Sequence, residues 1–330
     1  MNRKSAWIVF ALTLLITLPT RLYQILFLMD KKTGFYTDGN TTTAIISIGF
    51  VIGILLMVAL STMDRHESKG YHPIHSTPAA VIGALTGLGL VIESTVSLLD
   101  RSNSQNHFMY MILSVVGILT GAVLILTAYD FAVGENHLSK YPLLALVPPI
   151  WGCFCLVTLF ITYVAVVNVS ENIYDTFTVI FLLLFFFAQA KMFAGVENQK
   201  SSRLIYIFGL PAILLSLVTG IPGMVSFFSG TSQTGYFPIG LYFVAVLMAL
   251  YLFVFLAAVH RMQNTYSQYP EEQIEPQNPL LDCEAGTDES ETQTPELFEK
   301  KNCFEFLSKA YQSEEKFMER VQSPFYNSKN

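Results

Sequence analysis

The sequence predicts an all-α membrane protein, a bundle of about eight transmembrane helices with a cytoplasmic tail. Apolar stretches recur through roughly the first 260 residues, and each has the about 20 residues needed to cross the hydrocarbon core of a bilayer. Hydrophobic residues make up 52% of the chain and charged residues only 13%. Soluble domains carry about 25% charged residues. Long apolar runs in series with so little charge exclude an ordinary soluble fold.

Eight spans follow one another along the chain. They cover residues 6–29, 43–62, 78–99, 108–129, 142–167, 173–194, 203–224 and 238–260. The fifth contains Pro142, Pro148 and Pro149, and the seventh contains Pro211 and Pro222. Proline removes a backbone hydrogen bond but is tolerated in membrane helices when neighbouring groups satisfy the freed carbonyl. Kinks are therefore expected in these two spans.

Basic residues between the spans predict the orientation of the bundle. Lys and Arg in the connecting segments are concentrated on the side of the N-terminus. That side holds Arg3, Lys4, Arg65, Lys69, Lys140, Lys191, Lys200, Arg203 and Arg261, whereas the other side holds Lys31, Lys32 and Arg101. Because basic residues favour the cytoplasmic side, both ends of the chain are expected in the cytoplasm.

The chain is predicted to have three parts, a transmembrane bundle over 1–262, a flexible acidic linker over 263–294 and a C-terminal part over 295–330. Residues 261–330 hold 14 acidic and 7 basic side chains, so this part alone accounts for the negative net charge of −6 of the whole chain. The linker is too poor in apolar residues to offset its chain entropy by burial. Apolar residues at three- and four-residue spacing in the last part predict an amphipathic helix, which could bind a cytoplasmic protein, itself or the membrane.

Polar side chains within the spans are the candidate site residues, because such groups are costly in hydrocarbon. Arg21 in the first span and Glu93 in the third have opposite charge and similar depth, so they are candidates for a pair. The pair could join two helices or line a polar cavity, and Arg21 could instead reach the outer headgroups alone. Gln189 is predicted to make an interhelical hydrogen bond, and Lys191 to extend toward the inner headgroups.

Glycines in the third span predict close helix packing. Gly83 and Gly87 are four residues apart, and Gly89 follows in the same run. Small residues at this spacing let two helix backbones approach closely. Packing is the expected role, and such packing would also define the surroundings of Glu93 if that residue is functional.

Two distant segments share a pattern that leads from a proline to a Thr-Gly-aromatic-aromatic sequence. LITLPTRLYQILFLMDKKTGFY contains Pro19 and Thr33, and LVTGIPGMVSFFSGTSQTGYF contains Pro222 and Thr234. Internal similarity of this kind marks repeats in membrane folds. The alternative is two unrelated aromatic turns at the level of the headgroups.

The chain carries no clear signature of a catalytic, cofactor or metal site. The loop after the second span contains His66, His72 and His75 beside Asp64 and Glu67. Imidazoles and carboxylates can bind zinc or nickel, but the spacing fits no standard ligand pair, so a solvated loop is expected. The four cysteines lack the spacing of a zinc site or a disulfide framework. The chain has no HExxH, Walker or GxSxG motif.

The strings LPTRLYQILFLMDKKTGFYTDGN and FFFAQAKMFAGVENQKSSRLIYIFGLPA resemble a type of uncharacterised polytopic membrane protein found in Clostridia-like Firmicutes. The resemblance covers parts of the first, sixth and seventh spans. It implies a bacterial plasma membrane protein with no assigned activity, and it transfers no site residues.

Three functions remain open from the sequence. The favoured one is a non-enzymatic membrane scaffold or sensor with a cytoplasmic interaction tail, which needs the lipid bilayer and a cytoplasmic protein as partners. The second is a small-solute permease with a polar site near Arg21 and Glu93. The third is an intramembrane enzyme that acts on lipid or peptide. No basic patch indicates nucleic acid, and no cofactor is expected.

Overall fold

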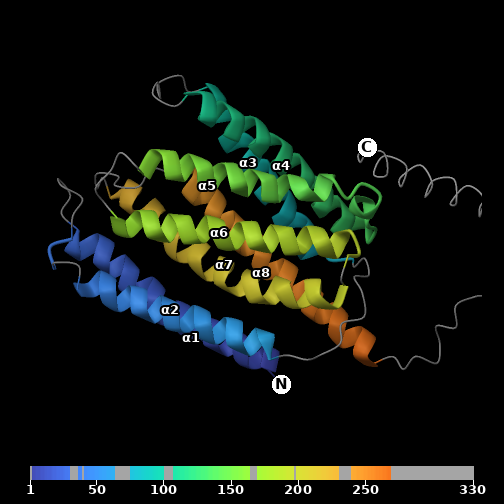
Figure 1. Cartoon of the computed structure of the whole chain (residues 1–330), viewed down its shortest axis with the longest axis horizontal. Helices are drawn as coiled ribbons and strands as arrows, with labels where there is room; N and C mark the ends of the chain where they lie inside the picture. The colour runs from blue at the N-terminus through green and yellow to red at the C-terminus, as the bar shows by residue number, and fades with distance from the viewer. Residues whose placement is uncertain are drawn as a thin grey trace, which may run out of the picture. The chain divides into compact units, whose positions relative to one another are not determined.

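Eight long α-helices make up most of the chain that the structure describes (Figure 1). The computed structural model describes residues 2–29, 36–38, 41–63, 75–99, 107–163, 169–196, 198–229 and 239–268. The helices are α1 (Asn2–Tyr23), α2 (Thr41–Thr62), α3 (Thr77–Leu99), α4 (His107–Val133), α5 (Val147–Tyr163), α6 (Val169–Phe193), α7 (Asn198–Phe228) and α8 (Ile239–Gln268). A π-helical turn η1 (Gln24–Leu28) extends α1, and the 3₁₀ turns η2 (His137–Ser139) and η3 (Leu144–Leu146) lie before α5.

Each of the eight helices is long and apolar enough to cross a bilayer, with spans of 18 to 29 residues. The predicted series of eight spans is therefore confirmed, and the chain is an integral multi-pass membrane protein. Only helices and closed barrels satisfy every backbone polar group within hydrocarbon, so the all-α fold suits this solvent.

Prolines act differently in the fifth and seventh spans. The fifth was expected from residue 142, but α5 begins at Val147 and has Pro148 and Pro149 in its first turn. First-turn prolines lose no helical hydrogen bond, because the N–H groups there have no partner within the helix. These two residues therefore begin the helix. By contrast, α7 continues as one α-helix through Pro211 and Pro222.

The last helix is longer than the sequence analysis predicted. α8 continues to Gln268, six residues past the expected end of the bundle at residue 262. The rest of the predicted linker and the whole of the predicted amphipathic helix lie outside the described residues.

Helices α3 to α8 form a closed ring of contacts. Each packs on the next in chain order, and α8 packs back on α3. α1 and α2 pack on one another and both contact α7, as Figure 1 shows. α7 is the most enclosed span, since 72% of its apolar window is buried, against 28% for α1 and for α2. The α1–α2 pair is thus joined to the ring largely through α7.

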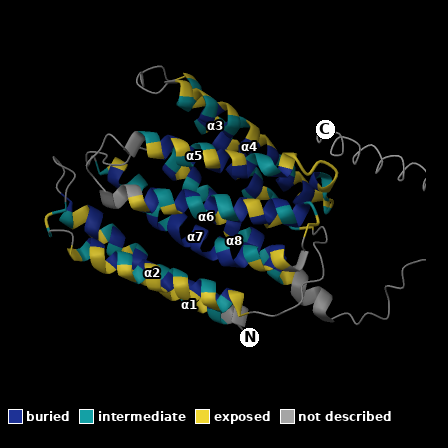
Figure 2. Ribbon diagram, viewed as in Figure 1, coloured by how far each residue is buried: buried dark blue, intermediate teal, exposed yellow. Residues whose placement is uncertain are grey.

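Aromatic side chains fill the ring between α4, α6 and α8. The Phe255 ring lies at the centre, with centroid distances of 5.8 Å to Phe131, 5.7 Å to Phe185, 6.1 Å to Phe193 and 6.0 Å to Tyr251. All five side chains are buried. On the lipid-facing side, Figure 2 shows exposed residues along α1 and α2, and these include many large apolar side chains. A bilayer explains that exposure, which would be unfavourable in water.

Glycines let α3 approach α4 and α8 closely. A methyl group added to Gly87 would lie 2.7 Å from the carbonyl oxygen of Gly121 on α4. One added to Gly83 would lie 3.2 Å from Cβ of Ala128, and one added to Gly89 would lie 2.8 Å from Cδ1 of Leu247 on α8. The predicted packing role of the glycine run is confirmed, and its two faces serve two different neighbours.

Candidate functional site

The most polar buried region of the bundle surrounds Arg21. This side chain lies well inside the first span and is only 2% exposed. Its Nη1 donates hydrogen bonds to Oε1 of Gln24 at 2.7 Å and to the hydroxyl of Tyr36 at 3.0 Å. Nε2 of Gln24 donates in turn to Oγ1 of Thr43 on α2 at 2.5 Å. These bonds join α1, the segment that follows it and α2.

Tyr174 extends this region to α6. The guanidinium carbon of Arg21 lies 4.6 Å from the centroid of the Tyr174 ring, which is a cation–π geometry. The Tyr174 hydroxyl lies 2.8 Å from Oγ of Ser47 on α2. One aromatic side chain on α6 therefore contacts both helices of the α1–α2 pair. The Arg21 network is defined here as Arg21, Gln24, Tyr36, Thr43, Ser47 and Tyr174.

Local structure after Arg21 positions the other members of the network. The helix changes to the π form at Gln24, and π turns are rare and frequently accompany functional sites. The backbone then pairs back on itself, with a bridge between Met29 and Tyr36 and a 2.9 Å bond from Thr37 N to the carbonyl oxygen of Leu28. This return places the Tyr36 hydroxyl beside the guanidinium.

Glu93 lies against the start of α8. Oγ of Ser97 donates a long hydrogen bond of 3.4 Å to its carboxylate, and the carboxylate lies directly against Gly240 at the start of α8. A negative charge is favourable at a helix N-terminus because the helix dipole is positive there. The contacts described for Glu93 are thus with α3 and α8, and the Arg21–Glu93 pair stays a prediction.

Two other polar residues of α6 are Gln189, which makes an interhelical hydrogen bond, and Lys191, whose extension to the inner headgroups stays a prediction. Nε2 of Gln189 donates a 2.6 Å hydrogen bond to the hydroxyl of Tyr251 on α8, and both residues are buried. Lys191, in the last turn of α6, lies with Nζ 5.5 Å from the centroid of the Phe187 ring.

A small cavity lies between α5, α6, α7 and α8. Its volume is about 40 Å³ and its surface is almost wholly apolar, and Trp151 and Tyr242 contribute to it. A cavity of this size holds about one to a few water molecules. Asp175, Thr178 and Thr219 also line it, with Oγ1 of Thr178 3.0 Å from Oγ1 of Thr219. Because Asp175 follows Tyr174, one turn of α6 serves both the cavity and the Arg21 network.

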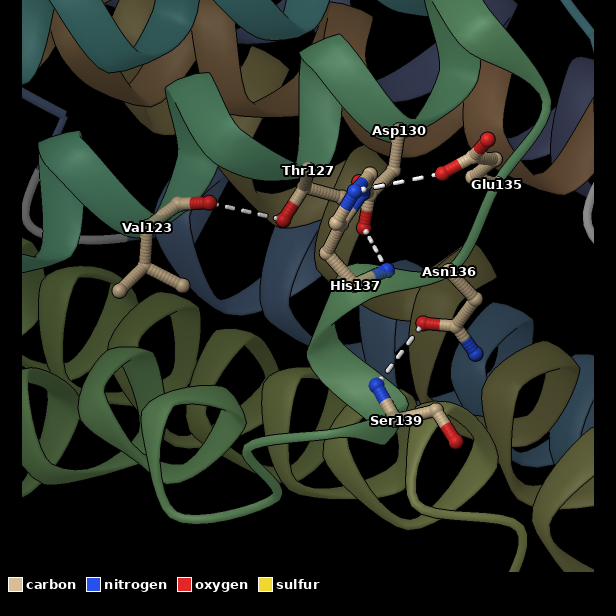
Figure 3. Close-up of polar contacts among 7 residues, drawn as sticks. All are labelled: Val123, Thr127, Asp130, Glu135, Asn136, His137 and Ser139. Carbon is tan, nitrogen blue, oxygen red and sulfur yellow. Dashed lines mark hydrogen bonds and ion pairs between the residues drawn. The ribbon is translucent and has the colours of Figure 1, made fainter.

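A second polar cluster lies where α4 ends (Figure 3). Oδ1 of Asp130 is 2.6 Å from Nδ1 of His137, and Oδ2 of Asp130 accepts the backbone N–H of His137 at 3.0 Å. Nε2 of His137 lies 3.3 Å from Oε2 of Glu135. Nδ2 of Asn136 donates to the carbonyl oxygen of Phe193 at the end of α6, so this connector is tied to a neighbouring helix.

The predicted His-rich loop ends beside this cluster. His75 lies against Gly134, the residue that follows α4, and is exposed. His66 and His72 lie outside the described residues, as do Thr33 and Thr234 of the two similar segments. Within the described ranges, no group of three or more His, Cys, Asp or Glu side chains could hold a metal ion.

Sequence reasoning missed two carboxylates that the structure places in the bundle. The predicted fourth span ends at residue 129 and so excludes Asp130, whereas α4 continues to Val133. The predicted sixth span, 173–194, includes Asp175, which is not among the predicted polar site residues, and α6 begins earlier, at Val169. A later limit for the fourth span would have identified Asp130 as a costly group within a helix, and Asp175 could have been identified within the predicted span itself.

Comparison of the chain with known protein families, with curated proteins and with solved structures gives no match.

Proposed function

We propose that the protein is a non-enzymatic membrane scaffold or sensor, whose helical bundle anchors a cytoplasmic interaction tail. The observation that carries the proposal is that polar side chains buried in the bundle bind one another from different helices. Such contacts link helices in hydrocarbon, where neighbouring apolar surfaces gain little from exclusion of water.

Two sets of contacts make these links. The Arg21 network joins α1 and α2 to α6, through the stacking of Arg21 on Tyr174 and the contact between Ser47 and Tyr174. The Gln189–Tyr251 hydrogen bond joins α6 to α8, next to the aromatic cluster around Phe255. A scaffold needs such fixed geometry.

The tail supplies the interacting part of the proposal. It follows α8 directly, on the side that the basic residues predict to be cytoplasmic, and residues 261–330 hold 14 acidic side chains against 7 basic ones. A flexible acidic linker before an amphipathic helix would present the apolar face of that helix to a cytoplasmic protein. A bacterial plasma membrane is the proposed location.

Deletion of the tail tests this function. The full chain and a variant of residues 1–268, which ends with α8, would be cross-linked in their own membrane, and the captured proteins quantified by mass spectrometry. A partner lost on truncation, and lost again in Leu307→Asp on the predicted apolar face, supports the proposal. Ser313→Asp on the opposite face is the matched control and should keep the partner. Identical cross-linked proteins with and without the tail would contradict the proposal.

A small-solute permease is the second candidate, favoured by the cavity between α5 and α8. Its proposed polar site shifts from Arg21 and Glu93 to the turn of α6 that holds Asp175 and Thr178, since these residues line the cavity. Stopped-flow light scattering of proteoliposomes under urea and glycerol gradients tests it. Entry faster than in protein-free vesicles, and slowed by Thr178→Val, would support a permease. Entry at the protein-free rate removes it for those solutes.

A further inference from the structure

The His137 side chain lies between two carboxylates. Its Nδ1 is 2.6 Å from Oδ1 of Asp130, and its Nε2 is 3.3 Å from Oε2 of Glu135 (Figure 3). The side chains of His137 and Glu135 are 33% and 61% exposed, whereas that of Asp130 is only 7% exposed. Water can therefore exchange a proton with the imidazole, while the Asp130 contact stays largely enclosed.

The number of protons on the ring decides which of these contacts is favourable. A neutral imidazole has one N–H donor and one lone pair, whereas an imidazolium has two donors. An ionised carboxylate has no hydrogen to donate, so it can only accept hydrogen bonds. In the neutral ring with Nδ1–H directed at Asp130, the Nε2 lone pair would face the negative Glu135 carboxylate. A proton taken from water onto Nε2 changes that repulsion into a second ion pair, so the observed geometry fits the imidazolium.

The same few residues connect α4 to α6. Gly134 has a positive φ of 82°, and the N–H groups of Gly134 and Glu135 both donate to the carbonyl oxygen of Asp130, at 2.8 and 3.2 Å. Oδ1 of Asn136 accepts the N–H of Ser139, while its Nδ2 donates to the carbonyl oxygen of Phe193. Glu135 and His137 are thus the neighbours in sequence of Asn136, which contacts the end of α6.

We propose that Asp130, Glu135 and His137 form a proton-sensitive latch that holds the α4–α5 connector against the end of α6. Protonation of His137 closes the latch by adding the Glu135 contact, and loss of that proton opens it. Histidine is the side chain whose charge ordinarily changes between pH 5 and 8. Because the closed latch needs the added proton, it is expected to be tighter at lower pH and to loosen as pH rises. It lies within the bundle and does not depend on the tail.

Other titratable or charged groups around the latch come from four elements. Tyr129 on α4 has its ring centroid 5.8 Å from that of His137. Lys140 follows in the same connector, His75 precedes α3 and lies against Gly134, and Lys191 lies on α6 over Phe187. Among the residues that the structure describes, His75 is a second imidazole beside the connector, so it is the residue that the experiment must separate from His137.

Hydrogen exchange of the connector amides tests the latch in the full-length protein. The reporters are the N–H groups of His137 and Ser139, which bond to Asp130 and Asn136. Their protection, corrected for intrinsic exchange, is expected to be about two- to fivefold higher at pH 5.5 than at pH 8, the range of a partly exposed ion pair. Glu135→Gln, at an exposed site that should fold normally, is expected to reduce the difference, because only the Asp130 ion pair then remains, and His137→Gln should remove it.

His75→Gln is the matched control and should keep the pH dependence. Equal protection at the two pH values in the unmodified protein would overturn the latch. So would a pH dependence that is undiminished in Glu135→Gln, one that survives His137→Gln, or one that His75→Gln abolishes. Each of these results leaves the cross-linking test of the tail unaffected, so a failure of the latch and a failure of the proposed function are distinguishable.

Discussion

The packing of α3 on α4 predicts that Gly87→Ala destabilises the bundle. The added methyl group would lie 2.7 Å from the backbone oxygen of Gly121 and 2.7 Å from Cγ1 of Ile125, with Ile125 N at 3.1 Å. Two of these three atoms belong to the backbone of α4, so a side-chain rotation cannot relieve the overlap. The two helices must move apart along their most closely packed length.

The expected loss follows from two opposing effects. Overpacking of a well-packed core costs about 1–3 kcal/mol, and contact with rigid backbone favours the upper half of that range. Alanine recovers about 1 kcal/mol relative to glycine within a helix. The net loss is then about 1–2 kcal/mol. At about 2–4 °C per kcal/mol for a chain of this size, the Tm should fall by about 2–8 °C.

Gly49 on α2 supplies the matched control, because a methyl group there would have no atom within 4 Å. Thermal unfolding of both variants in the same detergent, followed by intrinsic fluorescence, gives the comparison. Gly49→Ala should leave the Tm unchanged or raise it. The packing argument is refuted if Gly87→Ala melts at or above the temperature of Gly49→Ala.

Three further predictions concern other contacts. Gln189→Leu leaves the Tyr251 hydroxyl without its donor and should cost about 0.6 to 2 kcal/mol in thermal unfolding, whereas an unchanged Tm would contradict an interhelical bond. Gly240→Ala should displace the Glu93 carboxylate, so its penalty should disappear in a Glu93→Ala background, and equal penalties in both backgrounds would argue against the contact. Gly134→Ala should cost about 1–2 kcal/mol because its φ of 82° is unfavourable for a residue with Cβ, and a neutral result would contradict that turn.

The membrane spans could be predicted from the sequence because each depends only on local properties. An apolar stretch of sufficient length is a helix in hydrocarbon whatever its neighbours are. The predicted limits of two spans were wrong because the helix ends do not coincide with the ends of the apolar stretches. The apolar residues before α5 form the 3₁₀ turn Leu144–Leu146, and α8 continues through polar residues to Gln268.

The candidate site could be predicted only in part, because it depends on which helices are neighbours. Arg21 and Gln189 were identified as costly groups within spans, but the Tyr174 partner of Arg21 is 153 positions away and carries no charge to identify it. The contact of Glu93 with the start of α8 could not be predicted, since depth along a helix does not show which way a side chain points. The Asp130–His137 contact is local, and a later limit for the fourth span would have revealed it.

The central claim is that buried polar groups hold the helices of this bundle together, and the contact between Ser47 and Tyr174 tests it most directly. Ser47→Ala and Tyr174→Phe each remove the 2.8 Å contact between α2 and α6, and the phenylalanine ring can still stack on Arg21. The free energy of unfolding would be measured for both single variants and for the double variant. A coupling energy of about 0.6–1.7 kcal/mol is predicted, so the double variant should lose less than the two single losses added together. Single losses that add without coupling would contradict the claim.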